Sequence, residues 1–236
     1  MEKPSLPPFE SRLSPFELIA VLLWLPVHLL LLPLLFSRVG TKLSDAELNL
    51  LVYAVGAAYM LLAAHRFLRR DFDPLLDRPG WVLLEVGVCY GAMLLMNLAV
   101  GGLLSLFLGE QAQNPNNEAV VDLALRDYGK ISAAVIFLAP IVEECIFRGA
   151  IFGALRRFHR IGAMAVSVLA FALYHVWGYA IADPVFWLYA LQYVPAGYLL
   201  CRCYERCDSI WASIFFHMLV NAGSLRALVM LQEMLS

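Results

Sequence analysis

Charged side chains are scarce in this chain of 236 residues. Asp, Glu, Lys and Arg make up 15% of the sequence and hydrophobic residues 61%, whereas soluble domains average about 25% charged and about 45–50% apolar residues. A single core of this size cannot hold so many apolar side chains, so the composition excludes an ordinary soluble domain. It excludes a disordered chain for the same reason. The class that remains is an all-α, polytopic membrane protein.

The sequence also lacks a basic tail, an internal repeat and a disulfide framework. The formal net charge is −2, and we therefore expect no nucleic-acid partner. Of the five cysteines, Cys89, Cys145 and Cys201 lie within apolar runs, and Cys203 and Cys207 lie at the edge of one. No histidine stands between the last three cysteines, so reduced thiols are favoured there over a metal site.

Long apolar stretches dominate the sequence, and about 20 such residues are needed to cross a bilayer. Seven stretches qualify: 16–36, 49–65, 81–108, 131–153, 161–179, 184–203 and 209–235. The first is too long for a cleavable signal peptide and contains Pro26 and Pro33, so we expect it to remain as an anchor. A polar linker at 109–130 divides the chain into two expected parts: 1–130, with the N-terminal membrane helices and this linker, and 131–236.

Basic residues alternate between successive connections. Eleven Lys and Arg lie in the N-terminal tail and in 66–80, 154–160 and 202–208, against four in the other connections. By the positive-inside rule, we expect the N-terminus in the cytoplasm and the C-terminus outside. Arginine outnumbers lysine 14 to 3, a composition typical of GC-rich bacterial genomes, so the expected location is a bacterial inner membrane.

The stretch 131–153 contains three ionisable side chains, Glu143, Glu144 and Arg148. Such groups are costly at membrane depth and therefore indicate function. Glu144 and Arg148 are four residues apart, so they share one face of a helix and can pair. Glu143 points elsewhere and is left available for chemistry. The alternative is a salt-bridged patch with no further role, which two acids at this depth disfavour.

Two later stretches each contain a polar pair spaced by four residues. His175 follows Phe171, and His217 precedes Asn221. Either pair alone is typical of core packing or of helix association. Together with the acids, they are the parts needed for amide hydrolysis. A carboxylate and an imidazole can activate water, and a second imidazole and a carboxamide can stabilise an oxyanion.

The motifs Glu-Glu-x-x-x-Arg at 143–148, Phe-x-x-x-His at 171–175 and His-x-x-x-Asn at 217–221 resemble, in order and rough spacing, the three signature motifs of the CAAX-protease and bacteriocin-processing (CPBP, or Abi) family. Members of this family are intramembrane endopeptidases. The resemblance covers about 131–221 and implies that the part 131–236 is a catalytic core with four helices. Residues 1–130 carry no motif of the family.

The resemblance also implies roles for individual residues. Glu143 and His175 would activate the water, and His217 and Asn221 would form the oxyanion site. Glu144, Arg148 and Phe171 would support them. The implied substrate is a peptide or protein cleaved near the membrane, within membrane lipid, and a CAAX tail is one option among several.

A metal site is the alternative to a mechanism without a cofactor. Zinc could be ligated by Glu143, His175 and His217, but the sequence has no His-Glu-x-x-His spacing, so we favour the absence of a metal. Two other functions stay open. A proton-coupled transporter would use similar side chains but would be expected to show an inverted repeat. A non-catalytic immunity or assembly factor would be expected to have lost part of the site.

Since polar side chains in a membrane must face protein or water, we expect Glu143, His175, His217 and Asn221 to surround one polar cavity. Asn97, Glu17 and Glu85 are further residues that could line it. His28 lies in the first apolar stretch, and we interpret it as having no part in the site.

Overall fold

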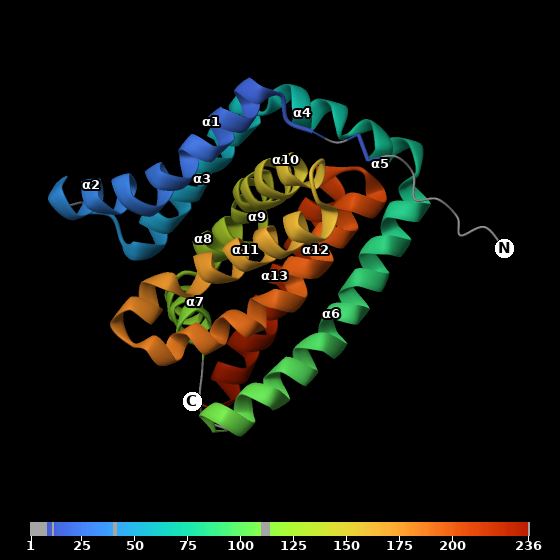
Figure 1. Cartoon of the computed structure of the whole chain (residues 1–236). Coiled ribbons are helices and arrows are strands. Elements are labelled where there is room, and N and C mark those ends of the chain that lie inside the picture. The colour runs from blue at the N-terminus through green and yellow to red at the C-terminus, as the bar shows by residue number, and fades with distance from the viewer. Residues whose placement is uncertain (1–8, 11, 40–41, 110–113, 236) are drawn as a thin grey trace.

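The computed structural model describes residues 9–10, 12–39, 42–109 and 114–235, and within them every regular element is helical (Figure 1). The predicted all-α class is confirmed. The first part of the chain contains α1 (Pro15–Pro26), the π-helical segment η1 (Val27–Leu31), α2 (Leu32–Val39), α3 (Asp45–Ala63), α4 (His65–Arg70), α5 (Asp73–Asp77) and α6 (Pro79–Leu108).

The second part begins with a helix formed by the polar linker. Its elements are α7 (Pro115–Arg126), α8 (Tyr128–Ser132), π-helical η2 (Ala133–Leu138), α9 (Ala139–Glu144), π-helical η3 (Cys145–Phe152), α10 (Gly153–Arg156), α11 (Arg160–Ala182), the 3₁₀ segment η4 (Pro184–Tyr193), α12 (Val194–Cys207) and α13 (Ile210–Leu235).

Local sequence explains where two of the first helices begin. Ser14 and Ser44 each cap a helix with their side chain, and the glutamate three residues later bonds back to the serine backbone N–H, which is the capping-box arrangement. Glu17, the partner of Ser14, also accepts a hydrogen bond of 3.0 Å from the backbone N–H of Phe67. Glu17 therefore ties the start of α1 to α4.

Five helical segments of the described residues are long and apolar enough to cross a membrane: Pro15–Phe36, Asp45–Ala63, Pro79–Leu108, Arg160–Ala182 and Ile210–Met234. The chain is thus an all-α polytopic membrane protein, but the count of seven spans is not confirmed. The other two expected spans, 131–153 and 184–203, each consist of shorter helical segments of different type. These segments follow one another directly: helix is continuous from Tyr128 to Arg156, and η4 leads into α12. One cause lies in the sequence: Pro140 has no N–H for the α-helical hydrogen bond to Ile136, and π-helical η2 ends just before it.

The helices form a central group flanked on two sides. The helices α1 and α3 lie side by side along one flank, and the long α6 runs along the opposite flank against α12 and α13 (Figure 1). Between them lie α9, η3, α11, α12 and α13, whose buried side chains include Phe147, Phe171, Leu200 and Phe216. The linker helix α7 packs against α3, α11 and α13. This arrangement brings residues from both parts of the chain to one place.

Candidate active site

The acid pair lies where α9 meets η3, and both carboxylates are buried. Arg148 donates a hydrogen bond of 2.9 Å from Nη1 to Glu144 Oε1, which is the expected pairing over four residues. Its Nη2 donates to the carbonyl of Gly197 in α12 at 3.2 Å. Since Glu144 and Arg148 are both fully buried, the pair neutralises two charges that lipid could not solvate.

Glu144 has two further partners, both in α13. Ser213 Oγ donates to Glu144 Oε2 at 2.6 Å, and His217 Nδ1 lies 2.8 Å from Glu144 Oε1. Because a carboxylate can only accept, Nδ1 of His217 carries the proton in this bond. Arg148 was the one partner expected for Glu144. Ser213 was not expected, although its position four residues before His217 places both side chains on one face of α13.

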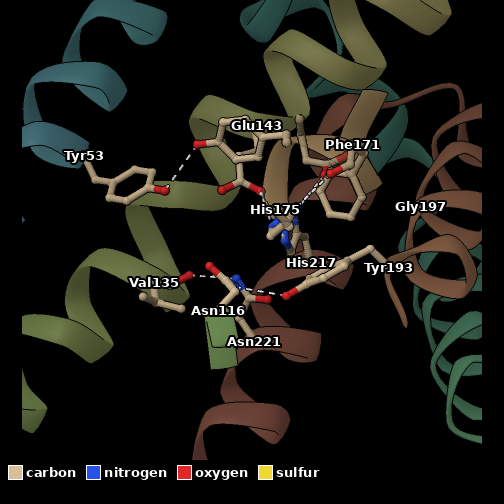
Figure 2. A network of polar contacts seen from close by, with 12 residues as sticks. Tyr53, Asn116, Val135, Glu143, Phe171, His175, Tyr193, Gly197, His217 and Asn221 are labelled. Atoms are coloured by element: carbon tan, nitrogen blue, oxygen red, sulfur yellow. Dashed lines mark hydrogen bonds and ion pairs between the residues drawn. The ribbon is translucent and has the colours of Figure 1, made fainter. Parts of the chain in front are cut away.

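Glu143 faces the two histidines. Its Oε2 lies 3.8 Å from Nε2 of His175 and 3.8 Å from Nε2 of His217, and Figure 2 shows the three side chains together. These distances exceed a direct hydrogen bond but suit one bridging water. Glu143 Oε2 is buried and has no hydrogen-bond partner. Buried polar atoms are nearly always satisfied, so this oxygen is available to a water or a substrate.

The ring of His175 is held on three sides. Its Nδ1 lies 2.8 Å from the carbonyl of Phe171, which requires the proton on Nδ1 and turns Nε2 towards Glu143. The rings of Phe171 and Tyr193 lie 4.5 and 4.3 Å from the imidazole, edge-on and stacked respectively. Phe171 also packs edge-on against His217, at 5.7 Å. This places Phe171 between the acid-base groups, in keeping with a supporting position.

Asn221 lies one helical turn beyond His217. One N–H of its carboxamide donates to the carbonyl of Val135 in η2 at 2.8 Å (Figure 2). The carboxamide carries a second N–H, and Asn221 lines the same cavity as His217. The bond to Val135 fixes the side chain, so the remaining N–H is preoriented with respect to the cavity.

One cavity of about 530 Å³ is shared by the two histidines, Glu143 and Asn221. Its lining includes the side chains named in the sequence analysis, Glu143, His175, His217, Asn221 and Asn97. Its polar wall also includes residues that carried no motif: Asn49, Tyr53, Asn116, Asn117, Tyr174, Gln192, Tyr193 and Ser224. Tyr174 and Ser224 lie on α11 and α13, the helices of His175 and His217. The others come from α3, the linker helix and η4, and no local spacing relates them to the motifs.

The linker helix supplies part of this wall. Asn114 and Asn116 each approach the hydroxyl of Tyr193 with Nδ2, at 3.2 and 3.0 Å, and Asn114 also donates to Gln192 at 2.7 Å. Since Tyr193 stacks on His175, the start of α7 helps to hold the imidazole in place.

Two acids named in the sequence analysis lie elsewhere. Glu17 caps α1, and Glu85 pairs with Arg202 and Arg206 at 2.8 and 2.9 Å; neither is among the residues that line the cavity. His28 contacts Tyr174 Oη at 2.9 Å through Nε2, so it is connected to the cavity wall. Among residues 9–10, 12–39, 42–109 and 114–235, no group of three or more His, Cys, Asp or Glu side chains has the arrangement of a metal site.

Comparison with known proteins concerns the same part of the chain. Residues 130–223 match the family described as type II CAAX prenyl endopeptidase Rce1-like. The protein named "Putative membrane peptidase YdiL" of Bacillus subtilis (strain 168) is 29% identical over 129 residues, which make up 54% of this chain and 49% of that protein. The alignment thus spans about half the length of that relative. No solved structure matches the chain.

The resemblance predicted from the three motifs is confirmed for the segment that carries them. The matched family is one of CAAX prenyl endopeptidases, and the relative carries the name of a membrane peptidase. The apolar helices agree with an integral membrane protein.

Proposed function

We propose that the chain is an intramembrane endopeptidase that hydrolyses a peptide bond of a membrane-associated or C-terminal-tail substrate with water activated by Glu143 and His175. The observation that carries this proposal is the environment of Glu143 Oε2. It is buried without a hydrogen-bond partner, and an imidazole Nε2 lies 3.8 Å away on each of two sides.

The hydrogen bonds of His175 define its part in the reaction. With the proton on Nδ1 and directed to Phe171, neutral His175 presents the lone pair of Nε2. A water between His175 and Glu143 can donate one hydrogen to each. As the water oxygen attacks the carbonyl carbon of the substrate, one of these bases takes its proton. The same proton passes to the leaving amine when the C–N bond breaks, which yields a carboxylic acid that keeps the second hydrogen of the water, and an amine.

In this mechanism, His217 and Asn221 would stabilise the oxyanion. His217 donates from Nδ1 to Glu144, so it can donate from Nε2 as well only when it is an imidazolium. The second N–H of Asn221 would be the other donor.

Cleavage of quenched-fluorescence peptides by purified protein in detergent tests the proposal. Three probes separate the substrate classes: a peptide ending in farnesylated Cys-Val-Ile-Met, the same peptide with Ser in place of its Cys, and an apolar peptide long enough to span a membrane. We expect Glu143→Gln and His175→Ala to reduce turnover by about 10²–10⁴-fold, with normal elution on gel filtration. Asp122→Asn, on the exposed face of α7, is the matched control. Full activity in Glu143→Gln would end the glutamate mechanism.

We further propose a cytoplasmic N-terminus, an outer C-terminus and a bacterial inner membrane as the location. The alternation of basic residues between the connections supports this orientation. Reporter domains fused to either end, one active only in the cytoplasm and one only outside, test it, and equal signals from both ends would contradict it.

A further inference from the structure

Three side chains form a row at one wall of the cavity. His28 Nε2, in η1, lies 2.9 Å from Tyr174 Oη in α11, and Tyr174 Oη lies 3.4 Å from Tyr53 Oη in α3. Both tyrosines line the cavity together with Glu143, and Figure 2 shows the hydroxyl of Tyr53 on the side of Glu143. His28 and Tyr53 lie outside the segment 130–223, so the family match assigns them nothing.

The unpaired atom of His28 indicates the direction of the hydrogen bonds. Its Nδ1 is buried and has no partner. A bare nitrogen without a donor is less costly to bury than an N–H without an acceptor. The favoured tautomer therefore has the proton on Nε2, which donates to Tyr174 Oη. This occupies the oxygen of Tyr174 as an acceptor and turns its O–H towards Tyr53.

The contact between the two tyrosines leaves the Tyr53 hydroxyl available. Ordinary O–H···O bonds measure about 2.5–3.0 Å, so the separation of 3.4 Å makes Tyr53 a weakly held acceptor. Its own hydrogen is not required by Tyr174 and is free to turn into the cavity. No hydrogen bond joins Tyr53 to Glu143 in the described part of the chain, so the carboxylate does not use this donor.

We propose that Tyr53 donates a hydrogen bond to a backbone carbonyl of the bound peptide and that Tyr174 and His28 position it. This inference rests on the proposed function, because it takes the cavity to be a peptide site. A carbonyl suits the position better than an anion, since Glu143 lies in the same cavity and would repel a negative charge. Tyr53 is thus a substrate-binding residue, and His28 is a positioning residue that acts through Tyr174.

The primary test compares Tyr53→Phe with Tyr59→Phe. Tyr59 also lies in α3 and ties it to α1 through a bond of 2.9 Å from its hydroxyl to the carbonyl of Ala20, and it is not among the residues that line the cavity. A neutral hydrogen bond contributes about 0.5–1.5 kcal/mol. We expect Tyr53→Phe to raise KM about 3- to 10-fold with kcat within twofold, because the bond is the same in ground and transition states. Tyr59→Phe should leave both constants unchanged.

Binding measured without turnover separates this inference from the proposed function. The Kd of a fluorescent, farnesylated peptide for Glu143→Gln protein should rise by the same factor when Tyr53→Phe is added. An unchanged Kd, a fall in kcat alone, or an equal effect of Tyr59→Phe would each overturn the inference. Failure of Glu143→Gln protein to bind the peptide would overturn it too. Cleavage that fails while Tyr53→Phe still weakens binding would count against the proposed hydrolysis only.

A double-mutant cycle tests the part of His28. If His28 acts through the tyrosines, His28→Phe should raise the Kd less than Tyr53→Phe does, and the double variant should match Tyr53→Phe alone. Additive effects would overturn the positioning role. ¹⁵N-histidine NMR of the protein without peptide gives a second measurement. We expect Nδ1 of His28 unprotonated and Nε2 protonated. The reverse tautomer would overturn the proposed direction of the hydrogen bonds from His28 to Tyr174 and Tyr53.

Discussion

The guanidinium of Arg148 lies 4.3 Å from the centre of the Phe171 ring, inside the protein. Nε of Arg148 has no hydrogen-bond partner, so the ring face supplies the favourable electrostatic contact on that side. The two residues belong to different motifs, and the contact holds η3 against α11. An ammonium on a lysine could not stack in this way.

We therefore expect Arg148→Lys to destabilise the fold almost as much as Arg148→Ala. Either change leaves the Glu144 carboxylate poorly paired in a dry site, and breaking a buried ion pair costs about 3–5 kcal/mol. Folded yield on gel filtration and the melting temperature in detergent should both fall. The exposed Arg157 serves as control, because Arg157→Lys should change neither. A normal yield of Arg148→Ala would show that the pair is not needed for folding.

Ser213→Ala should weaken both stability and turnover. It removes the donor of the 2.6 Å bond to Glu144, and a hydrogen bond to a charged group contributes about 1.5–3 kcal/mol. Ser209→Ala is the matched control, since Ser209 is also buried in this region and donates to the carbonyl of Asp71. It should lower the melting temperature but leave kcat unchanged. Equal losses of kcat in both variants would argue against a role for Ser213 in orienting Glu144.

Asn221→Ala should lower kcat by roughly 10²–10³-fold, the usual effect of losing one oxyanion donor. Part of any loss of stability will come from the bond to Val135, so melting temperature is followed alongside turnover. KM should change little, because the oxyanion exists only in the transition state. A raised KM with unchanged kcat would place Asn221 in substrate binding instead.

Chelation should leave turnover unchanged. The proposed mechanism obtains its nucleophile from Glu143 and His175, so incubation with EDTA or phenanthroline followed by gel filtration removes nothing that it requires. Turnover of the fluorescent peptide before and after treatment is the measurement. A loss that zinc restores would instead assign Glu143, His175 and His217 as ligands.

Glu205 makes the stability depend on acid pH. It lies beyond the expected span 184–203; its burial opposes ionisation, but hydrogen bonds from Arg160 and Arg156 outweigh this and lower the pKa of its carboxyl. A lowered pKa in the folded state means stability that is complete above the unfolded pKa of about 4.3 and is lost as the pH falls through the lower, folded value. In a series of measurements from pH 7 downwards, the melting temperature should therefore stay constant at first and decrease once the pH is lower than about 4.5. Glu205→Gln should melt lower at pH 7 with a flatter acid profile, and an unchanged profile would contradict the assignment.

The spacing of residues within one helix was enough to predict part of the site. Four-residue spacing places Glu144 beside Arg148, and the requirement that polar groups avoid lipid brings the motifs to a common cavity. Both predictions depend on local geometry and solvation only. They needed no knowledge of how the helices cross.

Contacts between helices could not be predicted in the same way. Whether Tyr53 or Asn116 reaches the cavity depends on the rotation and crossing of α3 and α7, which sequence spacing does not determine. His28 was interpreted as having no part in the site because a lone histidine in an apolar stretch carries no sign of its partner. The division of two expected spans was missed as well, although Pro140 offered a local reason for one of them, 131–153.

The pairing of Glu144 with Arg148 within one continuous helix has a consequence for biogenesis. The chain is made from its N-terminus, so the helix 128–156 is synthesised before α12 and α13 exist to supply Gly197, Ser213 and His217. An Arg or Asp at the centre of an inserting helix costs about 2.5–3.5 kcal/mol. Because Glu144 finds its counter-ion one turn away, this helix can neutralise that charge on its own while the later helices are still being translated.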